Sequence, residues 1–482
     1  MKKMNLLVMS LVSAAALSFT SCSSNDELDG NAGQAKVDQF YMTLTIQTPN
    51  SNGTRTAVKD YPTENATPAE SDVTSGTFYL VDANNKIVFT HTITKEEWAE
   101  KKIPTQGTPG KTTLQVPVKD VTAGTKYSVY FLANTTTSNS PLTDVFTSDN
   151  KFATAYSTAN NFAMFNQNDA DVKGNSHTVV FTSDNKDASS AAKVSSPINI
   201  ERLTARIDEP KSAVNTIQPY AEDATASKEQ KEANANAIKA VKSLKLTSYA
   251  ISNVANKTNV MQQWADETTL SIPTGINYFQ PTKEFGTKTL LQNYGYFNAV
   301  TTARSQKDYV FENNSSEAAT SMYFEYTVEL SDDYKTNADF EDGTFYRYNK
   351  VIYSRIQDII DAYKDQKAIF DGKDAATVKA ELKAAKDDTT DRETKLDEFR
   401  KKYDIEVFNA GKTYYVQKIQ DQHLGVANTI QRNSIYLLNV KNIFNVGAQV
   451  PNGGPDDRTL YYLDVEVSVN PWVLNEQSVE FE

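Results

Sequence analysis

FYMTLTI, residues 40–46 of the 482-residue chain, places Phe40, Met42, Leu44 and Ile46 on one side and mostly polar residues on the other. Alternation with a period of two is typical of a half-buried β-strand. Outward from this stretch, short strand-like segments recur with turn-forming residues between them: 77–81, 86–90, 114–116, 127–132, 178–181, 198–207, 413–416 and 434–440. Short strands at this spacing predict a mainly all-β chain built from β-sandwiches.

The far end of the chain alternates in the same way, in YLDVEVSVNPW, residues 462–472. Its apolar positions are Leu463, Val465, Val467 and Val469. Chain ends usually fray, so a terminus of strand quality indicates a docking role. Pro471 cannot donate a ladder hydrogen bond, and we expect it to end or bend this strand. A second short strand through Val479 and Phe481 is expected to follow.

Two stretches depart from the strand pattern. An acidic stretch rich in Ala, Lys and Asn, around 209–238, breaks the apolar pattern and is the candidate domain boundary. Residues 351–402 carry isoleucines at helical spacing and an Ala/Lys/Glu-rich run, which predicts a helical insertion. The sequence therefore predicts one β-sandwich domain over 56–210. A second is predicted over 211–482, with the insertion 351–402 and a terminal strand within 460–482.

The composition excludes several classes of function. A net charge of −12 and a pI near 5.0 argue against a nucleic-acid partner. A single cysteine excludes an intrachain disulfide and a multi-thiolate zinc site, and the three histidines are far apart and outside any HExxH pattern. We therefore expect no metal site and no cofactor.

Catalytic motifs are weak. Residues 107–112 (GTPGKT) faintly resemble a phosphate-binding loop, but Thr105 stands where its first glycine is needed, and a hairpin turn is the simpler interpretation. Ser-x-x-Lys occurs at 148–151 and 183–186, in turn sequences and without a separate Lys-Thr-Gly. We expect that the protein is not an enzyme.

The first residues indicate export. Lys2 and Lys3 precede a short apolar run that ends in small residues, which is typical of a signal peptide over 1–21. The run is too short to span a membrane. Small residues directly before Cys22 resemble a bacterial lipobox, which implies that Cys22 is acylated and anchors the precursor in the outer membrane through palmitate. The acidic residues 23–29 are either a surface-export tag or a solvated linker.

Both ends of the chain resemble the fimbrillin superfamily, most closely the major shaft subunits of Mfa-type short fimbriae. The resemblance lies in the first 60 residues, the segment near 197–207, and residues 411–482 with IQRNSIY (430–436) and DVEVSVNPW (464–472). It implies two transthyretin-like β-sandwich domains and subunits that join by protease-triggered donor-strand exchange. The second of these domains would carry the helical insertion.

The resemblance also implies a cut between Arg55 and Thr56 by an Arg-specific protease. Arg55 lies in NGTRT, within a turn-rich stretch soon after the first strand, and exposed loop tips are preferred sites of nicking. Lys59 is a nearby alternative for a trypsin-like enzyme. Residues 22–55 would then be a lipidated propeptide with a removable strand. Their loss with the signal peptide deletes four basic and four acidic residues, so the net charge stays at −12.

Strand exchange after a cut at Arg55 is also physically reasonable. A tethered strand competes with other strands at an effective concentration near millimolar. A cut after Arg55 removes the tether, and the apolar slot that the strand leaves can take up a neighbour's C-terminal strand by β-augmentation. We expect a structural shaft subunit of a cell-surface fimbria, a pilus that supports adhesion and biofilm formation. Its partners would be identical subunits joined head to tail, with separate anchor and tip subunits.

Two alternatives remain open from sequence. One is a fimbrial anchor or tip adhesin of the same superfamily. An anchor should keep its lipid and lack a cleavable loop, and a tip subunit needs no free donor strand. The other is a monomeric surface lipoprotein that binds a glycan or another ligand. A glycan binder needs an exposed aromatic platform, whereas most Tyr and Phe residues here fall at alternating strand positions that predict core.

Overall fold

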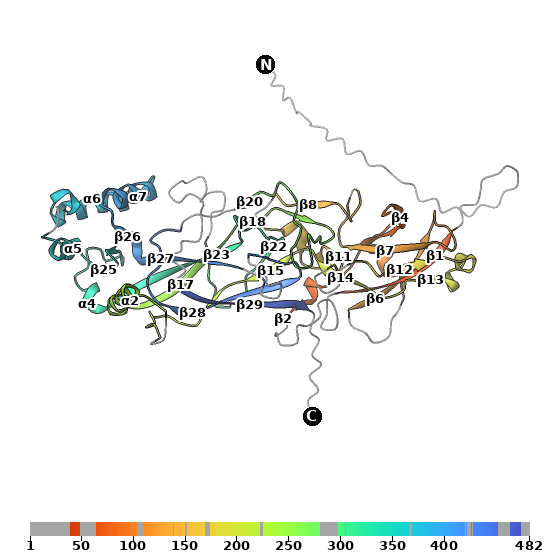
Figure 1. Ribbon diagram of the computed structural model, residues 1–482, viewed down its shortest axis with the longest axis horizontal. Coiled ribbons are helices and arrows are strands. Elements are labelled where there is room, and N and C mark those ends of the chain that lie inside the picture. The colour runs from red at the N-terminus through yellow and green to blue at the C-terminus, as the bar shows by residue number, and fades with distance from the viewer. Residues whose placement is uncertain are drawn as a thin grey trace, which may run out of the picture. The chain divides into compact units, whose positions relative to one another are not determined.

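Strands predominate in the computed structural model (Figure 1), which confirms the mainly all-β fold. It describes residues 39–48, 64–103, 110–137, 139–149, 152–168, 174–221, 225–279, 297–303, 305–365, 369–419, 421, 426, 428–451 and 463–473. Within this part of the chain the aromatic residues of the strands are mainly core, as expected from their alternation.

The first half of the chain builds a ten-stranded sheet. Its order is β4-β3-β7-β11-β14-β1-β6-β5, with β12 beside β7 and β13 beside β1. The strands are β1 (Phe40–Gln47), β3 (Gly76–Val81), β4 (Ile87–Ile93), β5 (Lys102–Ile103), β6 (Lys111–Val118), β7 (Lys126–Ala133), β11 (Met164–Asn166), β12 (Thr178–Val180), β13 (Ala192–Lys193) and β14 (Ile198–Arg202). Its apolar faces surround one core, to which β1, β3, β6, β7 and β14 all contribute.

Two further sheets surround another core, and most of their strands come from the second half of the chain. One has the order β2-β29-β28-β15-β22 with β16 beside β28, and the other has the order β21-β17-β23-β27. Their strands are β2 (Glu64–Asn65), β15 (Ala205–Asp208), β16 (Lys211–Ser212), β17 (Val241–Ser252), β21 (Asn298–Ala299), β22 (Lys307–Val310), β23 (Ser321–Leu330), β27 (Lys412–Lys418), β28 (Ser434–Ile443) and β29 (Leu463–Val473). Residues of β15, β17, β23 and β28 form the centre of this core.

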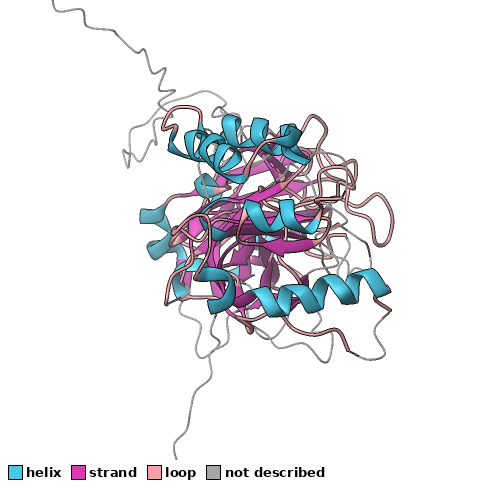
Figure 2. Ribbon diagram, turned by 90° about the vertical axis from the view of Figure 1, so that its left-hand side faces the viewer, coloured by secondary structure: helices cyan, strands magenta, loops and turns pink. Residues whose placement is uncertain are grey.

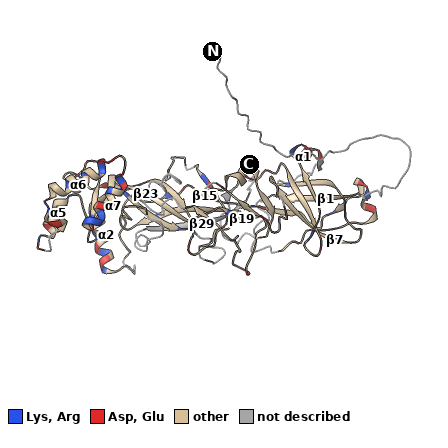
Figure 3. Cartoon of the chain, turned by 90° about the horizontal axis from the view of Figure 1, so that it is seen from above, with Lys and Arg blue, Asp and Glu red and all other residues tan. Residues whose placement is uncertain are grey.

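A third core is helical. Helices α5 (Ile356–Ala362), α6 (Ala375–Asp387) and α7 (Arg392–Tyr403) pack with the small sheet of β24 (Phe345–Tyr348), β25 (Val351–Tyr353) and β26 (Glu406–Phe408). Helix α6 begins at Asp374, whose side chain accepts a hydrogen bond from the Thr377 N–H at 2.8 Å. Figure 2 shows the helices in front of the strands, and the colours of Figure 3 show Lys, Arg, Asp and Glu positions concentrated on them. Helices thus fall within the range expected for the insertion.

Helix α2 and several shorter helices and strands lie outside these sheets and the helical core. They are α1 (Lys95–Lys101), α2 (Lys228–Ala240), α4 (Asp332–Lys335), β8 (Val145–Thr147) with β19 (Lys257–Asn259), β9 (Ser157–Thr158) with β10 (Asn161–Phe162), and β18 (Val254–Ala255) with β20 (Tyr278–Phe279). A 3₁₀ turn, η1, covers Pro68–Glu70.

Three local expectations differ from the structure. The single strand expected over 198–207 is two strands, because the chain leaves the first sheet after Arg202 and enters the second at Ala205. The stretch that breaks the apolar pattern contains helix α2, which begins with a capping box between Ser227 and Gln230. The strand does not end at Pro471, as one of the two expectations for this proline had it, but continues to Val473. An edge strand tolerates proline because it needs fewer ladder hydrogen bonds.

Candidate functional site

Strand β1 occupies an interior position of the first sheet. It pairs antiparallel with β6 along its whole length, from Phe40 opposite Val118 to Gln47 opposite Lys111. On its other side it pairs in parallel with β13 and then with β14, in two short registers. Because β6 and β5 lie beyond β1 in the sheet, β1 connects them to the other strands.

The apolar side of β1 is fully packed. Phe40, Met42, Leu44 and Ile46 are each at most 3% exposed and belong to the first core. At roughly 1.5–3 kcal/mol for each such side chain, their burial stabilises the docked strand by about 6–12 kcal/mol before chain entropy is counted. Loss of β1 would therefore leave an apolar slot and an unpaired edge on β6, which is a template for another strand.

The C-terminal strand β29 lies in the sheet of its own chain. It pairs antiparallel with β28, from Leu463 opposite Ile443 to Pro471 opposite Ser434, with a bulge in β28 between Val440 and Asn442. Val465 is half-buried and packs against the second core. In the same ladder Leu463 lies opposite Ile443, Val467 opposite Leu438 and Val469 opposite Tyr436.

The other side of β29 is mostly an edge. Strand β2 pairs with it in parallel, and only at Trp472 and Val473. Among the described residues no other strand pairs with this side of β29. The short strand expected through Val479 and Phe481 lies outside the described residues.

The segment between β1 and β2 links these two features along the chain. It contains Arg55 and Thr56, which lie outside the described residues, as does Cys22. Residues 48–63 thus join the strand in the first sheet to the strand beside the end of β29. Cleavage between Arg55 and Thr56 and lipidation of Cys22 therefore stay predictions.

Soon after β2, Glu70 attaches the chain to the sheet that contains β15 and β22. Its carboxylate accepts hydrogen bonds from the Thr67 N–H (2.7 Å), Arg206 (3.2 Å), Lys307 (3.1 Å) and the Tyr309 hydroxyl (2.8 Å). Burial alone would raise the pKa of Glu70, but these partners, with Arg206 foremost, lower it to about 2. The carboxylate is therefore charged at neutral pH and holds η1 against β15 and β22.

Arg202 continues this network towards the C-terminal region. The guanidinium is fully buried and donates to the Glu70 carbonyl oxygen (2.6 Å), Ser71 Oγ (2.7 Å) and Asn433 Oδ1 (2.9 Å). Burial lowers the pKa of Arg202 to about 9, against the favourable field of the Glu70 carboxylate. Sequence reasoning missed Glu70 and Arg202 because their partners are distant in sequence.

Arg432, in the IQRNSIY motif, has a structural role in the second half of the chain. It is 2% exposed and forms an ion pair with Glu312 at 2.7 Å. It also donates to the carbonyl oxygens of Val260 (2.9 Å) and Asn259 (2.6 Å). The motif therefore anchors the start of β28, the strand on which β29 lies.

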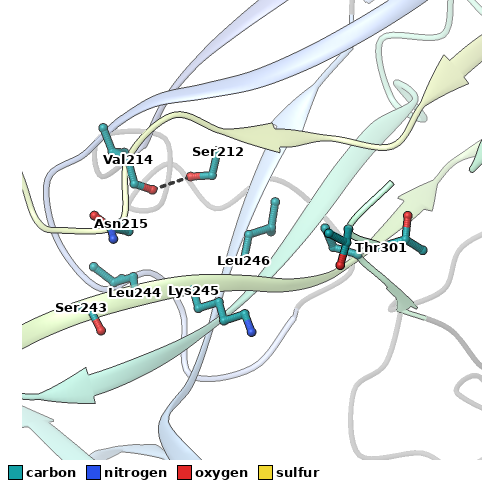
Figure 4. Close-up of a pocket in the computed structure, with 10 residues that line it drawn as sticks. Ser212, Val214, Asn215, Ser243, Leu244, Lys245, Leu246 and Thr301 are labelled. Carbon is teal, nitrogen blue, oxygen red and sulfur yellow. Dashed lines mark hydrogen bonds between the residues drawn. The ribbon is translucent and has the colours of Figure 1, made fainter. Parts of the chain in front are cut away.

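A cavity of about 510 Å³ lies beside β17 (Figure 4). Ser243–Leu246 line it from the strand, and Figure 4 shows Val214 and Thr301 on opposite sides of them. On the side away from β23, no described strand pairs with this part of β17. One backbone contact does reach it, since the Leu244 N–H donates to the Asn215 carbonyl at 2.8 Å.

Metal-binding clusters and membrane-spanning helices are both absent from the described residues. No group of three or more His, Cys, Asp and Glu side chains within them is arranged to hold a metal ion. No helix among them combines the length and the apolar character needed to cross a bilayer.

The C-terminal part of the chain matches a known family. Residues 406–478 match the family described as "Major fimbrial subunit protein type IV, Fimbrillin, C-terminal". This range runs from β26 past the end of β29 and includes Arg432. The resemblance to fimbrillins is thereby confirmed for this region. No curated protein matches the sequence.

Three solved structures from Parabacteroides distasonis ATCC 8503 are similar. Two are candidate cell adhesion proteins. One has 12% identity and a TM-score of 0.45, covering 90% of this chain and 98% of that one. The other has 13% identity and a TM-score of 0.48, covering 91% and 100%. The third is a fimbrial assembly protein with 12% identity and a TM-score of 0.31, covering 60% and 82%. With TM-scores below 0.5 these likenesses carry no inference about function.

Proposed function

We propose that this chain, whose residues 406–478 match the fimbrillin C-terminal family, is a structural shaft subunit of a bacterial surface fimbria of the Mfa type. The precursor would be anchored in the outer membrane through Cys22. An Arg-specific protease would cut it between Arg55 and Thr56. Each subunit would then accept a C-terminal strand from its neighbour.

The observation that carries this proposal is the position of β1. It is an interior strand with a completely buried apolar side, and it ends only eight residues before Arg55 in the sequence. A cut at Arg55 would convert β1 from a tethered part of its own sheet into a separate peptide. Loss of the tether removes the high effective concentration that favours the precursor's own strand.

The Glu70 network supports a cut at this place. Glu70 follows Arg55 in the sequence and is held by Arg206, Lys307 and Tyr309. The new N-terminal part would therefore stay attached to the second sheet while the peptide that contains β1 is free to leave. Only the groove of the first sheet would open.

The donor in this proposal is the strand within 460–482. In the unassembled chain β29 pairs with its own β28 and, at its end, with β2. Donation would exchange these contacts for the neighbour's groove beside β6. The mostly unpaired side of β29 favours this exchange, because few ladder contacts have to break there.

The experiment that tests the donor compares two adjacent positions. Since Val465 packs against the core, strand alternation predicts that Val467 faces the same side and that Ser468 faces water. Val467→Asp, or deletion of 473–482, should leave a secreted and cleavable protein that fails to form fibres, whereas Ser468→Asp should assemble. SDS-resistant ladders on unheated gels and negative-stain microscopy measure the outcome. Normal ladders from both the Val467→Asp variant and the deletion would exclude a C-terminal donor.

A further inference from the structure

A small cavity in the first half of the chain has the chemistry of a ligand site. It encloses about 260 Å³ where the pairing along β7 changes from β11 to β12. This volume is below the roughly 300–1,000 Å³ of pockets that enclose drug-sized ligands. The size therefore favours a ligand of about one sugar ring.

The cavity exists because side-chain amides replace a strand at this point. Asn166 Oδ1 accepts from the Phe131 N–H at 2.7 Å, and its Nδ2 donates to the Val129 carbonyl at 3.2 Å. Asn175 Nδ2 donates to the same carbonyl at 3.0 Å. The amides satisfy the backbone of β7 while leaving room beside it.

Asn168 makes the wall rigid. Its Nδ2 donates to the Gln262 carbonyl (2.6 Å), and its Oδ1 accepts from the Gly174 N–H (2.8 Å). Its main-chain oxygen accepts from Trp264 Nε1 at 2.6 Å. These bonds fix the indole of Trp264 at the cavity and join two segments that are distant in sequence. A pre-organised wall reduces the entropy that a ligand loses on binding.

Two polar groups of the lining remain available. The Gln263 amide uses its Nε2 to donate to the Leu142 and Met261 carbonyls, so its oxygen is the free acceptor. Among the described residues, none forms a hydrogen bond with that oxygen or with the Tyr130 hydroxyl, although both residues line the cavity. A hydroxyl donor can therefore meet an amide oxygen here, next to a second hydroxyl that donates or accepts.

The lining also determines the charge of the ligand. Its described residues are Tyr, Trp, Met, Gly and side-chain amides, and none carries a charge. Phosphates and carboxylates would lack a cationic partner, and a cation would lack an anionic one. An aromatic face with hydrogen-bonding amides suits a molecule with one apolar face and several hydroxyls. We propose that this cavity binds a neutral saccharide residue at the end of a glycan.

Saccharide binding is separate from fibre assembly, so it can be tested on a chain that has not assembled. The probes for the full-length unprocessed chain are galactose, glucose, mannose and N-acetylglucosamine, with N-acetylneuraminic acid and adenosine as competing chemistries. Saturation-transfer NMR should show contact with at least one neutral sugar, and titration should give a dissociation constant on the order of 1 mM. Adenosine or the acidic sugar as the preferred probe would overturn the proposal, as would no neutral sugar in contact.

Variants locate the site. Gln263→Ala and Tyr130→Phe each remove one polar group and should weaken sugar binding about five- to tenfold. Trp264→Ala should abolish it. Gln357→Ala, an exposed amide on helix α5, is the matched control and should bind like the wild type. Circular dichroism melting shows whether each variant is folded. Wild-type affinity in folded Gln263→Ala and Tyr130→Phe variants would refute this location.

Discussion

Leu44 is the position at which the role of β1 can be measured most cleanly. Its side chain is 0% exposed and pairs across the sheet with Leu114, which is also 0% exposed. Leu→Ala substitutions at such sites cost about 2–5 kcal/mol, because the lost transfer free energy adds to that of the cavity left behind. Leu44→Ala should therefore lower the precursor's melting temperature by about 4–20 °C, taking about 2–4 °C per kcal/mol for a unit of this size.

The same substitution should not affect the assembled fibre. Residues 1–55 leave during the proposed processing, so the mature subunit no longer contains Leu44. The assay therefore has two parts: thermal unfolding of the purified precursor followed by circular dichroism, and the temperature at which fibres dissociate in SDS. Thr43→Ala, on the half-buried opposite face of the strand, is the control and should change the precursor's free energy of unfolding by less than about 1 kcal/mol.

Two results would refute this reasoning. An unchanged precursor melting temperature would mean that β1 is not a packed strand of the first sheet. A lower dissociation temperature for fibres of the Leu44→Ala variant would mean that β1 remains in the fibre, and strand replacement would then be wrong.

Two further predictions concern the anchor and the buried charges. Replacement of Cys22 by Ala should abolish metabolic palmitate labelling of the precursor, and labelling that persists in the variant would exclude Cys22 as the acylated residue. Glu70 has a folded pKa of about 2 against an ordinary value of 4.5, so its stabilisation is complete above about pH 4.5 and is lost as the pH falls towards 2. Between pH 7 and pH 2.5 the free energy of unfolding of the wild type should fall by on the order of 2 kcal/mol more than that of Glu70→Gln, after allowance for solvent screening. The same pH dependence of the free energy of unfolding in both proteins would contradict this.

Alternation accounts for the parts of the fold that could be predicted. One face of β1 is buried in the core and the other is half-buried, so apolar and mostly polar residues alternate along residues 40–46. The break after Arg202 leaves no such mark. Leu203 and Thr204 are both buried, so they do not interrupt the strand-like pattern. The chain therefore changes sheets between two segments that each have the sequence of a strand. Helix α2 was signalled locally by Ser227 and Gln230, in a stretch whose weak apolar pattern hid it.

The candidate site was less predictable than the fold. Strand alternation identified the apolar face of β1, but not that β6 and β5 depend on β1 for their connection to the sheet. The buried charges depend on pairs such as Glu70 with Arg206 and Arg432 with Glu312, more than a hundred residues apart. In a chain with 61 acidic side chains, no local pattern distinguishes these from solvated ones.

The measurement that tests the central claim most directly is fibre formation by the purified full-length precursor before and after treatment with an Arg-specific protease, with Arg55→Ala as the matched variant. Negative-stain microscopy and unheated SDS gels detect the fibres, and N-terminal sequencing identifies the processed end. The account predicts fibres only after cleavage, subunits that begin at Thr56, and none from the Arg55→Ala precursor. Fibres from uncleaved precursor, or mature subunits that begin at Cys22, would contradict it.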